Sequence, residues 1–234
     1  MVSWLFATVS VYKKLEDPYD PQAASCAAQM FLDSGDGVVF KGAIGPWYSP
    51  EGWGQFHLSQ KAAKELMSLV LKSYKLKRGK YPNEVFLHGK TAFDEKEWEG
   101  FAEANRPGTQ MVGVKIRRTN DIRLFTLRTH PVLRGIAAII DGKRAYLWTS
   151  GFVPRLQTYP GMEVPVPLSV DISKGAGDIT SVLRDVLALT KLNYNACVFA
   201  DGVPVTLRFA DAVGEILTAG PLEGIAPLPF KYYI

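Results

Sequence analysis

Alternating apolar and polar residues near the amino terminus predict a sheet that begins with antiparallel strands. Residues 3–13 are rich in β-branched and aromatic side chains, and the prolines at 18 and 21 then impose a loop. A second strand is predicted over 24–32. The turn sequence Asp-Ser-Gly-Asp-Gly at 33–37 leads into a third strand over 38–41, so this region is predicted to be a hairpin.

The hydrophobic pattern then changes to a helical period. Ser59 is a suitable N-cap, and a strand over 84–88 follows the helix that it begins. After this strand, Asp94 and Glu97 have the spacing of a capping box at the start of a second helix. The apolar face of the first helix is predicted to hold Ala62, Ala63, Leu66, Leu69, Val70 and Tyr74.

Basic residues gather at the end of the first helix. We interpret this cluster first as a complement to the helix dipole at a solvated helix end, and contact with a ligand is the alternative. Its members are Lys72, Lys75, Lys77, Arg78 and Lys80.

The second half of the chain again mixes strands and helices. An Asp141-Gly142 turn predicts a hairpin, and Gly220-Pro221 ends the last helical pattern. The predicted elements are strands over 112–116, 123–127, 135–140 and 144–149, and helices over 179–190 and from 206. Consecutive antiparallel strands followed by helix, strand and helix predict an α/β fold with a mixed sheet, not a doubly wound parallel one.

Composition excludes several classes of protein. The 234 residues are 47% hydrophobic and 21% charged, which is typical of a globular chain with its own core and excludes a disordered, collagenous or coiled-coil chain. Cys26 and Cys197 lack the spacing of a thiolate metal site. The uncharged first twelve residues are too short to span a bilayer, and without a targeting element we expect a cytoplasmic protein and no membrane partner.

Positive charge is concentrated in one segment. Residues 106–134 contain seven Lys or Arg residues and one Asp, which gives +6, whereas the whole chain has a net charge of +4. A polyanionic partner would need such a concentration of charge. The candidates from this segment for binding nucleic acid are Arg117, Arg118 and Arg134.

Acidic residues are missing where metal-dependent phosphoryl chemistry would need them. That chemistry requires carboxylates from separate strands that converge on two divalent ions. The first strand has no acid between Ser3 and Lys14, and the predicted strand that ends near residue 88 is followed by Gly89 and Lys90. Because no metal ligand is suitably spaced around them, His57, His88 and His130 are interpreted as structural.

Several stretches, taken in order, resemble a known family. They are ATVSVY at 7–12, QMF at 29–31 with GVV at 37–39, PNEVFLH at 82–88, PVLRG at 131–135, LTKLNYN at 189–195 and PVTLRFAD at 204–211, followed by an aromatic tail. Together they resemble the PIWI half of Argonaute proteins, in particular short prokaryotic Argonautes with a degenerate nuclease site. The resemblance implies one PIWI domain over 1–234, an RNase H-like mixed β-sheet flanked by helices, with the MID half absent from this chain.

The resemblance also assigns the positions of the nuclease site. Ser10 stands at the first aspartate, Lys90 at the second and Asp211 at the fourth. The glutamate finger is expected within 41–53, where Glu51 is the only acid. A lysine adds positive charge where a two-metal site needs negative charge, so the resemblance implies binding without cleavage, no enzymatic activity and no catalytic metal.

Further residues are assigned to nucleic acid by the same resemblance. Lys191, Asn193, Asn195 and Arg208 are expected to contact guide phosphates. The carboxylate of Ile234 is expected at the pocket for the guide 5′ phosphate, where the resemblance implies a Mg²⁺ ion. The implied partners are a guide, expected to be RNA, a complementary DNA target, a MID domain and an APAZ-type effector protein with a TIR, sirtuin-like or nuclease domain.

Three functions remain open from the sequence. The first is a noncatalytic guide and target binding part of a prokaryotic defence system, in which target recognition triggers the effector. The second is an active RNase H-like guided nuclease. This function needs clustered carboxylates, which are missing at the positions described above. The third is a purely structural protein-interaction domain, which is favoured if the basic residues of 106–134 are scattered and do not line one channel.

Overall fold

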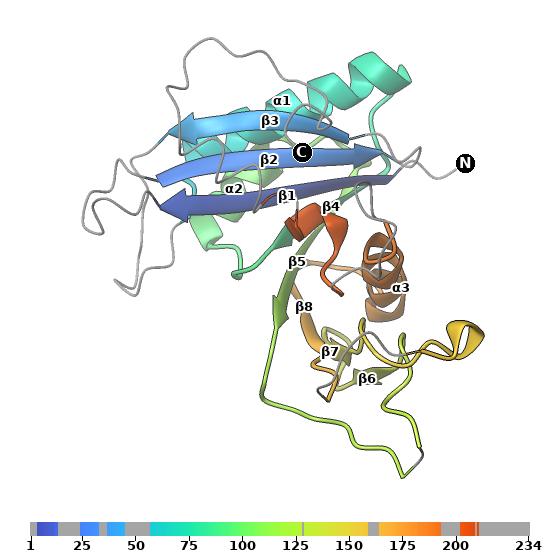
Figure 1. Ribbon diagram of the computed structural model, residues 1–234. Coiled ribbons are helices and arrows are strands. Elements are labelled where there is room, and N and C mark those ends of the chain that lie inside the picture. Colours follow the sequence, from blue (N-terminus) through green and yellow to red (C-terminus); the bar gives the residue numbers. More distant parts are fainter. Residues whose placement is uncertain are drawn as a thin grey trace. The chain divides into compact units, whose positions relative to one another are not determined.

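The computed structural model describes residues 4–13, 24–32, 37–44, 57–127, 129–158, 164–192, 202–208 and 210 (Figure 1). The chain forms two compact units. The first contains Met1–Gly113 and Thr206–Ile234, and the second contains Val114–Val205. The single domain expected over 1–234 stays a prediction.

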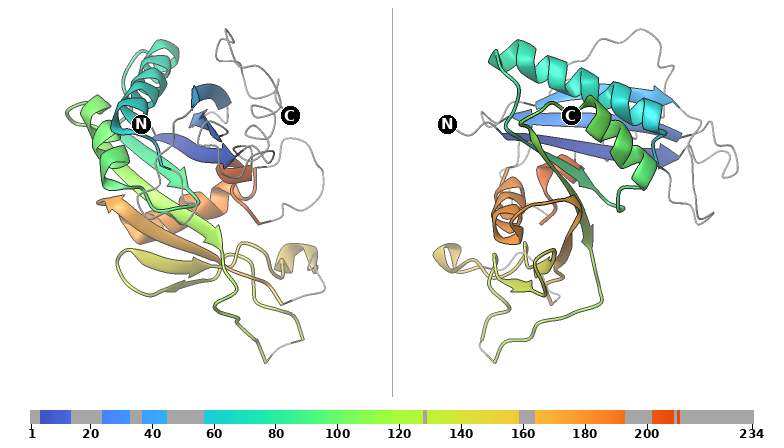
Figure 2. Two further views of the ribbon diagram at one scale, coloured as in Figure 1. Left: turned by 90° about the vertical axis from the view of Figure 1, so that its left-hand side faces the viewer. Right: turned by 180° about the vertical axis from the view of Figure 1, so that it is seen from behind.

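The first unit contains a mixed sheet with the strand order β3-β2-β1-β4-β5. β1 pairs antiparallel with β2 and parallel with β4, and β2 pairs antiparallel with β3, so the predicted hairpin and the mixed sheet are both confirmed. The helices α1 and α2 cover one face of these strands (Figure 2). The bounds are β1 Trp4–Lys13, β2 Ala24–Leu32, β3 Gly37–Ile44, α1 Gln60–Arg78, β4 Glu84–Gly89, α2 Glu95–Ala104 and β5 Gln110–Arg118.

Helix α1 begins and ends at the predicted signals. The Ser59 hydroxyl accepts a hydrogen bond from the Ala62 amide at 3.3 Å, and Gly79 adopts a left-handed conformation (φ 74°) that ends the helix. Its buried face includes Met67 and Leu71, whereas the predicted face residue Leu69 is 38% exposed, so that assignment was wrong. Like the other described helices, α1 is not apolar enough to span a membrane.

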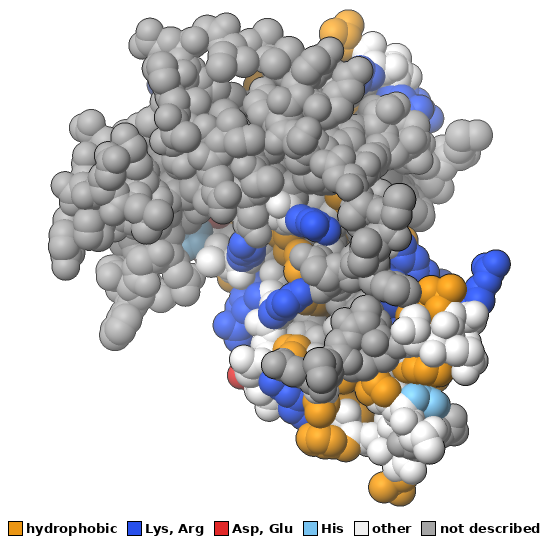
Figure 3. Space-filling model, viewed as in Figure 1, with side chains coloured by type: hydrophobic (Ala, Val, Ile, Leu, Met, Phe, Trp, Pro, Cys, Tyr) orange, Lys and Arg blue, Asp and Glu red, His pale blue; other side chains and the backbone are white. Residues whose placement is uncertain are grey.

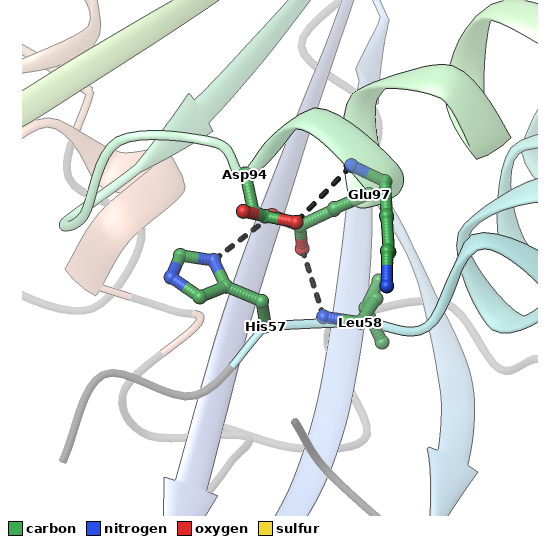
Figure 4. A network of polar contacts seen from close by, with 5 residues as sticks. His57, Leu58, Asp94 and Glu97 are labelled. Atoms are coloured by element: carbon green, nitrogen blue, oxygen red, sulfur yellow. Dashed lines mark hydrogen bonds and ion pairs between the residues drawn. The ribbon is translucent and has the colours of Figure 1, made fainter. Parts of the chain in front are cut away.

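Only half of the predicted capping box forms at α2. The Asp94 carboxylate accepts a hydrogen bond from the Lys96 amide at 3.1 Å, which confirms the N-cap. The buried Glu97 carboxylate turns away from this cap, accepting from the Leu58 amide at 3.2 Å and lying 3.3 Å from His57 Nδ1 (Figure 4). Glu97 therefore joins α2 to the residues that precede α1.

A close contact between α1 and α2 depends on a glycine. A Cβ atom on Gly100 would overlap the backbone carbonyl of Gln60 and would lie 2.9 Å from the Ala63 Cβ. The absence of a side chain thus allows the two helices to approach. The apolar core below them includes Leu66, Tyr74, Leu87, Phe93 and Phe101.

The second unit contains the rest of β5, followed in sheet order by β8, β7 and β6. β6 and β7 form the predicted hairpin, and Asp141 accepts hydrogen bonds at its turn from the Lys143 and Arg144 amides, both at 2.8 Å. The Asp178 carboxylate caps α3 by accepting from the Ser181 amide at 2.8 Å. The bounds are β6 Ala137–Ile139, β7 Arg144–Leu147, η2 Pro154–Leu156, β8 Leu168–Gly175 and α3 Ile179–Leu189.

Two strand assignments differ from the prediction in this unit. The strand predicted over 123–127 is wrong, because this segment is irregular and leaves the apolar side chains of Phe125 and Leu127 exposed. β8 was missed behind a proline-rich stretch. Its alternation of buried Leu168, Val170 and Ile172 with partly exposed residues is the two-residue period of a half-buried strand.

Candidate nucleic-acid interface

In the first unit, the strand register places Ser10 and Lys90 at equivalent positions along two neighbouring strands. β1 and β4 run parallel with Thr8 opposite His88. Ser10 lies two residues beyond Thr8, and Lys90 lies two residues beyond His88, next to the end of β4. The two positions assigned to nuclease aspartates are therefore equivalent on neighbouring strands, and the side chain of Lys90 is exposed.

His88 connects this strand end to the last described helical segment. Its side chain is 1% exposed, and Nδ1 lies 3.1 Å from the Thr206 hydroxyl. Burial lowers the pKa of His88 from 6.5 to about 3, so the imidazole is neutral at physiological pH. The pair fixes the start of the segment that carries Arg208.

Arg208 lies within a helical turn. The helix predicted from residue 206 already includes Val205, because residues 205–208 are helical after Pro204. Thr206 and Leu207 are buried, whereas the Arg208 side chain is exposed. A cation held this way on an anchored turn can meet a phosphate at the surface.

In the second unit, two stretches that the sequence singled out come together at the end of α3. The Arg134 guanidinium donates from Nη2 to the Thr190 carbonyl at 3.3 Å and to the Thr190 hydroxyl at 3.2 Å. Thr190 ends α3, and the exposed Lys191 follows it directly. Arg134 thus holds the helix end from which Lys191 extends.

The environment of Arg134 is partly apolar. The residue is half-buried, and its Nε atom is buried without a hydrogen-bond partner among the described residues. Burial lowers the pKa of Arg134, although an arginine remains charged at physiological pH. This side chain has a packing function at the helix end, and its contact with nucleic acid stays a prediction.

Arg117 and Arg118 lie at the exposed end of β5. Successive strand residues point to opposite faces, so the two guanidinium groups do not line one surface. Arg117 lies 3.9 Å from Asp121. Because both side chains are exposed, this ion pair contributes little to the stability of the protein. Both remain candidates for phosphate contact as separate cations.

Within the second unit, the described basic residues of 115–134 differ in their surroundings. Lys115 is half-buried on β5, and Arg123 donates to the Asn120 side chain at 3.0 Å. On the face shown in Figure 3, Lys and Arg side chains are interspersed with hydrophobic ones. This distribution is the one expected for the protein-interaction alternative.

The three histidines have structural contacts, as predicted. His57 is buried against Glu97 and His88 against Thr206. His130 stacks on Phe152 with ring centroids 4.4 Å apart. Within the described segments, no group of three or more His, Cys, Asp or Glu side chains could hold a metal ion.

Several predicted site residues lie outside the described residues. These are Asn193, Asn195, Asp211 and Ile234, together with Glu51 and the Mg²⁺ expected at Ile234. In contrast, Thr190 and Thr206 were not singled out, although both lie inside the stretches 189–195 and 204–211. Their position in those stretches was the available signal.

The architecture defines an RNase H-like α/β fold with a mixed sheet flanked by helices. Among solved structures, the chain is similar to Clostridium butyricum Argonaute bound to a guide DNA and a 19-mer target DNA, with a TM-score of 0.70 and 15% identity over 92% of this chain. A. aeolicus Argonaute gives a TM-score of 0.62 at 15% identity over 97% of the chain. Marinitoga piezophila Argonaute in complex with a 5′ OH guide RNA gives 0.64 at 14% identity over 99%.

These likenesses concern the fold. The chain spans 27%, 30% and 31% of those three Argonaute chains. No family model matches the sequence, and no curated protein matches it. The predicted fold class is confirmed, with Argonautes as the structural neighbours.

Proposed function

We propose that this chain is the noncatalytic guide and target binding part of a short prokaryotic Argonaute system, which triggers an associated effector when a target is recognised. The observation that carries the proposal is the fold likeness to Argonautes over 92–99% of the chain, two of which are solved with bound nucleic acid. The anchored cations Arg208 and Lys191 supply phosphate contacts.

The absence of cleavage is the second part of the proposal. It rests on the equivalent positions of Ser10 and Lys90 on β1 and at the end of β4. Two divalent ions about 4 Å apart need carboxylates to neutralise them, and a lysine at one of these positions opposes metal binding.

Binding is tested with the chain together with a MID domain, by fluorescence anisotropy on a 5′-phosphorylated guide strand at increasing salt. Lys191→Ala and Arg208→Ala are each expected to weaken binding and to reduce the slope of log K against log salt by roughly one unit. Lys61→Ala removes an exposed charge at the start of α1 and serves as the matched control. An affinity that does not respond to salt would contradict the proposal.

Cleavage is tested by incubating the guide-loaded complex with a matched target and Mg²⁺ or Mn²⁺. No metal-dependent products are expected. Products that disappear in an Asp211→Ala variant would show an active nuclease.

A protein-interaction domain without nucleic acid is the second candidate. It is favoured by the different surroundings of Lys115, Arg117, Arg118 and Arg123 in the second unit. The exposed apolar side chains of the same unit, among them Phe125, Ile139 and Leu156, also favour it. Coexpression with an APAZ-type effector protein distinguishes the two candidates. A stable complex whose effector stays silent with guide and target would support this second function, whereas activation by both nucleic acids would support the first.

A further inference from the structure

Two cations, one in α1 and one just after α2, lie over the same aromatic ring in the first unit. Lys75 Nζ, in the last turn of α1, is 4.9 Å from the centroid of the Tyr81 ring. The Arg106 guanidinium, which follows the C-cap of α2, is 5.0 Å from the same centroid. Helix α1, the segment after it and the end of α2 therefore converge on Tyr81.

Further basic residues flank Lys75 in the sequence. Lys72, Lys75, Lys77, Lys80 and Arg106 are all exposed, and none of the five forms an ion pair with another described residue. Glu103, three residues before Arg106, is bound to Lys64 at 2.9 Å and to the Gln60 amide at the start of α1. We name Lys72, Lys75, Lys77, Lys80, Tyr81 and Arg106 the Tyr81 patch.

The helix dipole explains only part of the Tyr81 patch. Lys75 and Lys77 lie in the last turn of α1, where cations are stabilised by the dipole. Lys80 lies beyond the Gly79 cap of α1, and Arg106 lies beyond the Asn105 cap of α2. The Gly79 amide already donates to the Lys75 carbonyl at 2.7 Å, so a backbone donor satisfies this carbonyl at the end of α1.

The geometry brings like charges close together. Because Lys75 and Arg106 each lie near 5 Å from one centroid, their charges are no more than about 10 Å apart, which is the Debye length at 0.1 M salt. The ring face offsets part of this repulsion. A ligand with closely spaced negative charges would offset the rest, and a nucleic acid backbone has this property.

We propose that the Tyr81 patch is a second backbone-binding site for nucleic acid, separate from Lys191 and Arg208. It rests on the proposed function and extends it. The Tyr81 ring is half-buried and faces two cations, so the site binds phosphates without stacking on bases. Binding there is therefore independent of sequence.

The test compares two triple variants in the full chain with its MID domain. Lys75→Gln, Lys80→Gln and Arg106→Gln remove three of the five positive charges of the patch, and Lys61→Gln, Lys143→Gln and Arg155→Gln remove the same charge from exposed positions elsewhere. Affinity is measured over a salt series with a 5′-phosphorylated single strand and with a blunt duplex. The patch triple is expected to reduce the slope of log K against log salt by about 2 to 3 units, and the control by less than one.

The outcomes separate this inference from the proposed function. Equal slopes for the two triples, with binding weakened by Lys191→Ala and by Arg208→Ala, would overturn the Tyr81 patch alone. No binding by the unmodified chain would overturn both.

Because Leu76 is 88% exposed beside these lysines, binding to vesicles of phosphatidylcholine and phosphatidylserine is measured as a further arm of the experiment. Loss of vesicle binding in the patch triple without loss of nucleic acid binding would assign the site to a membrane surface and refute our proposal.

Discussion

Acidification should destabilise the first unit through His88. The side chain is 1% exposed, and burial lowers its pKa from 6.5 to about 3. Between these two values the unfolded chain binds a proton that the folded chain does not. Stability is therefore lost as the pH falls below about 6.5, and the loss stops near pH 3, where the folded state also becomes protonated.

The size of the effect follows from the shift in pKa. At about pH 5, the unfolded imidazole is protonated and the folded one is neutral, which costs about 2 kcal/mol relative to pH 7. The limiting cost below pH 3 is about 5 kcal/mol on the same scale. For a chain of this length, 2 kcal/mol corresponds to a fall in melting temperature of about 4 to 8 °C.

The assay compares the chain with a His88→Gln variant, which keeps a polar side chain near Thr206 but does not titrate. Urea unfolding at about pH 7 and pH 5 gives the free energy of unfolding of each protein. The other histidines are present in both proteins, so their contributions to the free energy of unfolding cancel in the difference. An equal loss of stability in the two proteins would refute the assignment of the lowered pKa to His88.

Three further substitutions test the packing that positions the candidate interface, each by denaturant unfolding without nucleic acid. Gly100→Ala should cost about 1 to 3 kcal/mol because its Cβ would overlap the backbone of α1, whereas the exposed Glu99→Ala in the same helix should change little, and equal effects would contradict the close approach. Arg134→Ala should cost about 2 kcal/mol, because two hydrogen bonds to Thr190 are lost, and an unchanged stability would show that the side chain is free for ligand. Ser59→Ala should cost about 1 kcal/mol through the lost cap of α1, and a cost near zero would remove that role.

Local signals in the sequence predicted most of the elements. Ser59, Asp94 and the Asp141-Gly142 turn mark the helix starts and the hairpin that the structure contains. Such signals act over three or four residues, and the local chemistry alone decides them. The strand prediction over 123–127 was wrong because a pattern of apolar residues does not reveal whether a partner strand exists.

Local sequence patterns could not predict contacts between residues that are distant in the sequence. Glu97 has the spacing of a capping box, yet a histidine 40 residues earlier and the amide beside it satisfy its carboxylate. Arg134 was assigned to nucleic acid from the charge of its segment, and the structure adds hydrogen bonds to Thr190, 56 residues later. Tertiary packing therefore determines which cations are left exposed for a ligand.

The exposed apolar side chains of the second unit have a practical consequence for handling the protein. β6 is the last strand in the sheet order, and Ile139 on this strand and Ile140 after it are about half exposed. A sheet edge with apolar side chains is a template for pairing with another chain. At high concentration without a partner, the protein should self-associate through this edge, so that a charged substitution such as Ile139→Lys is the first change to make when preparing monodisperse samples.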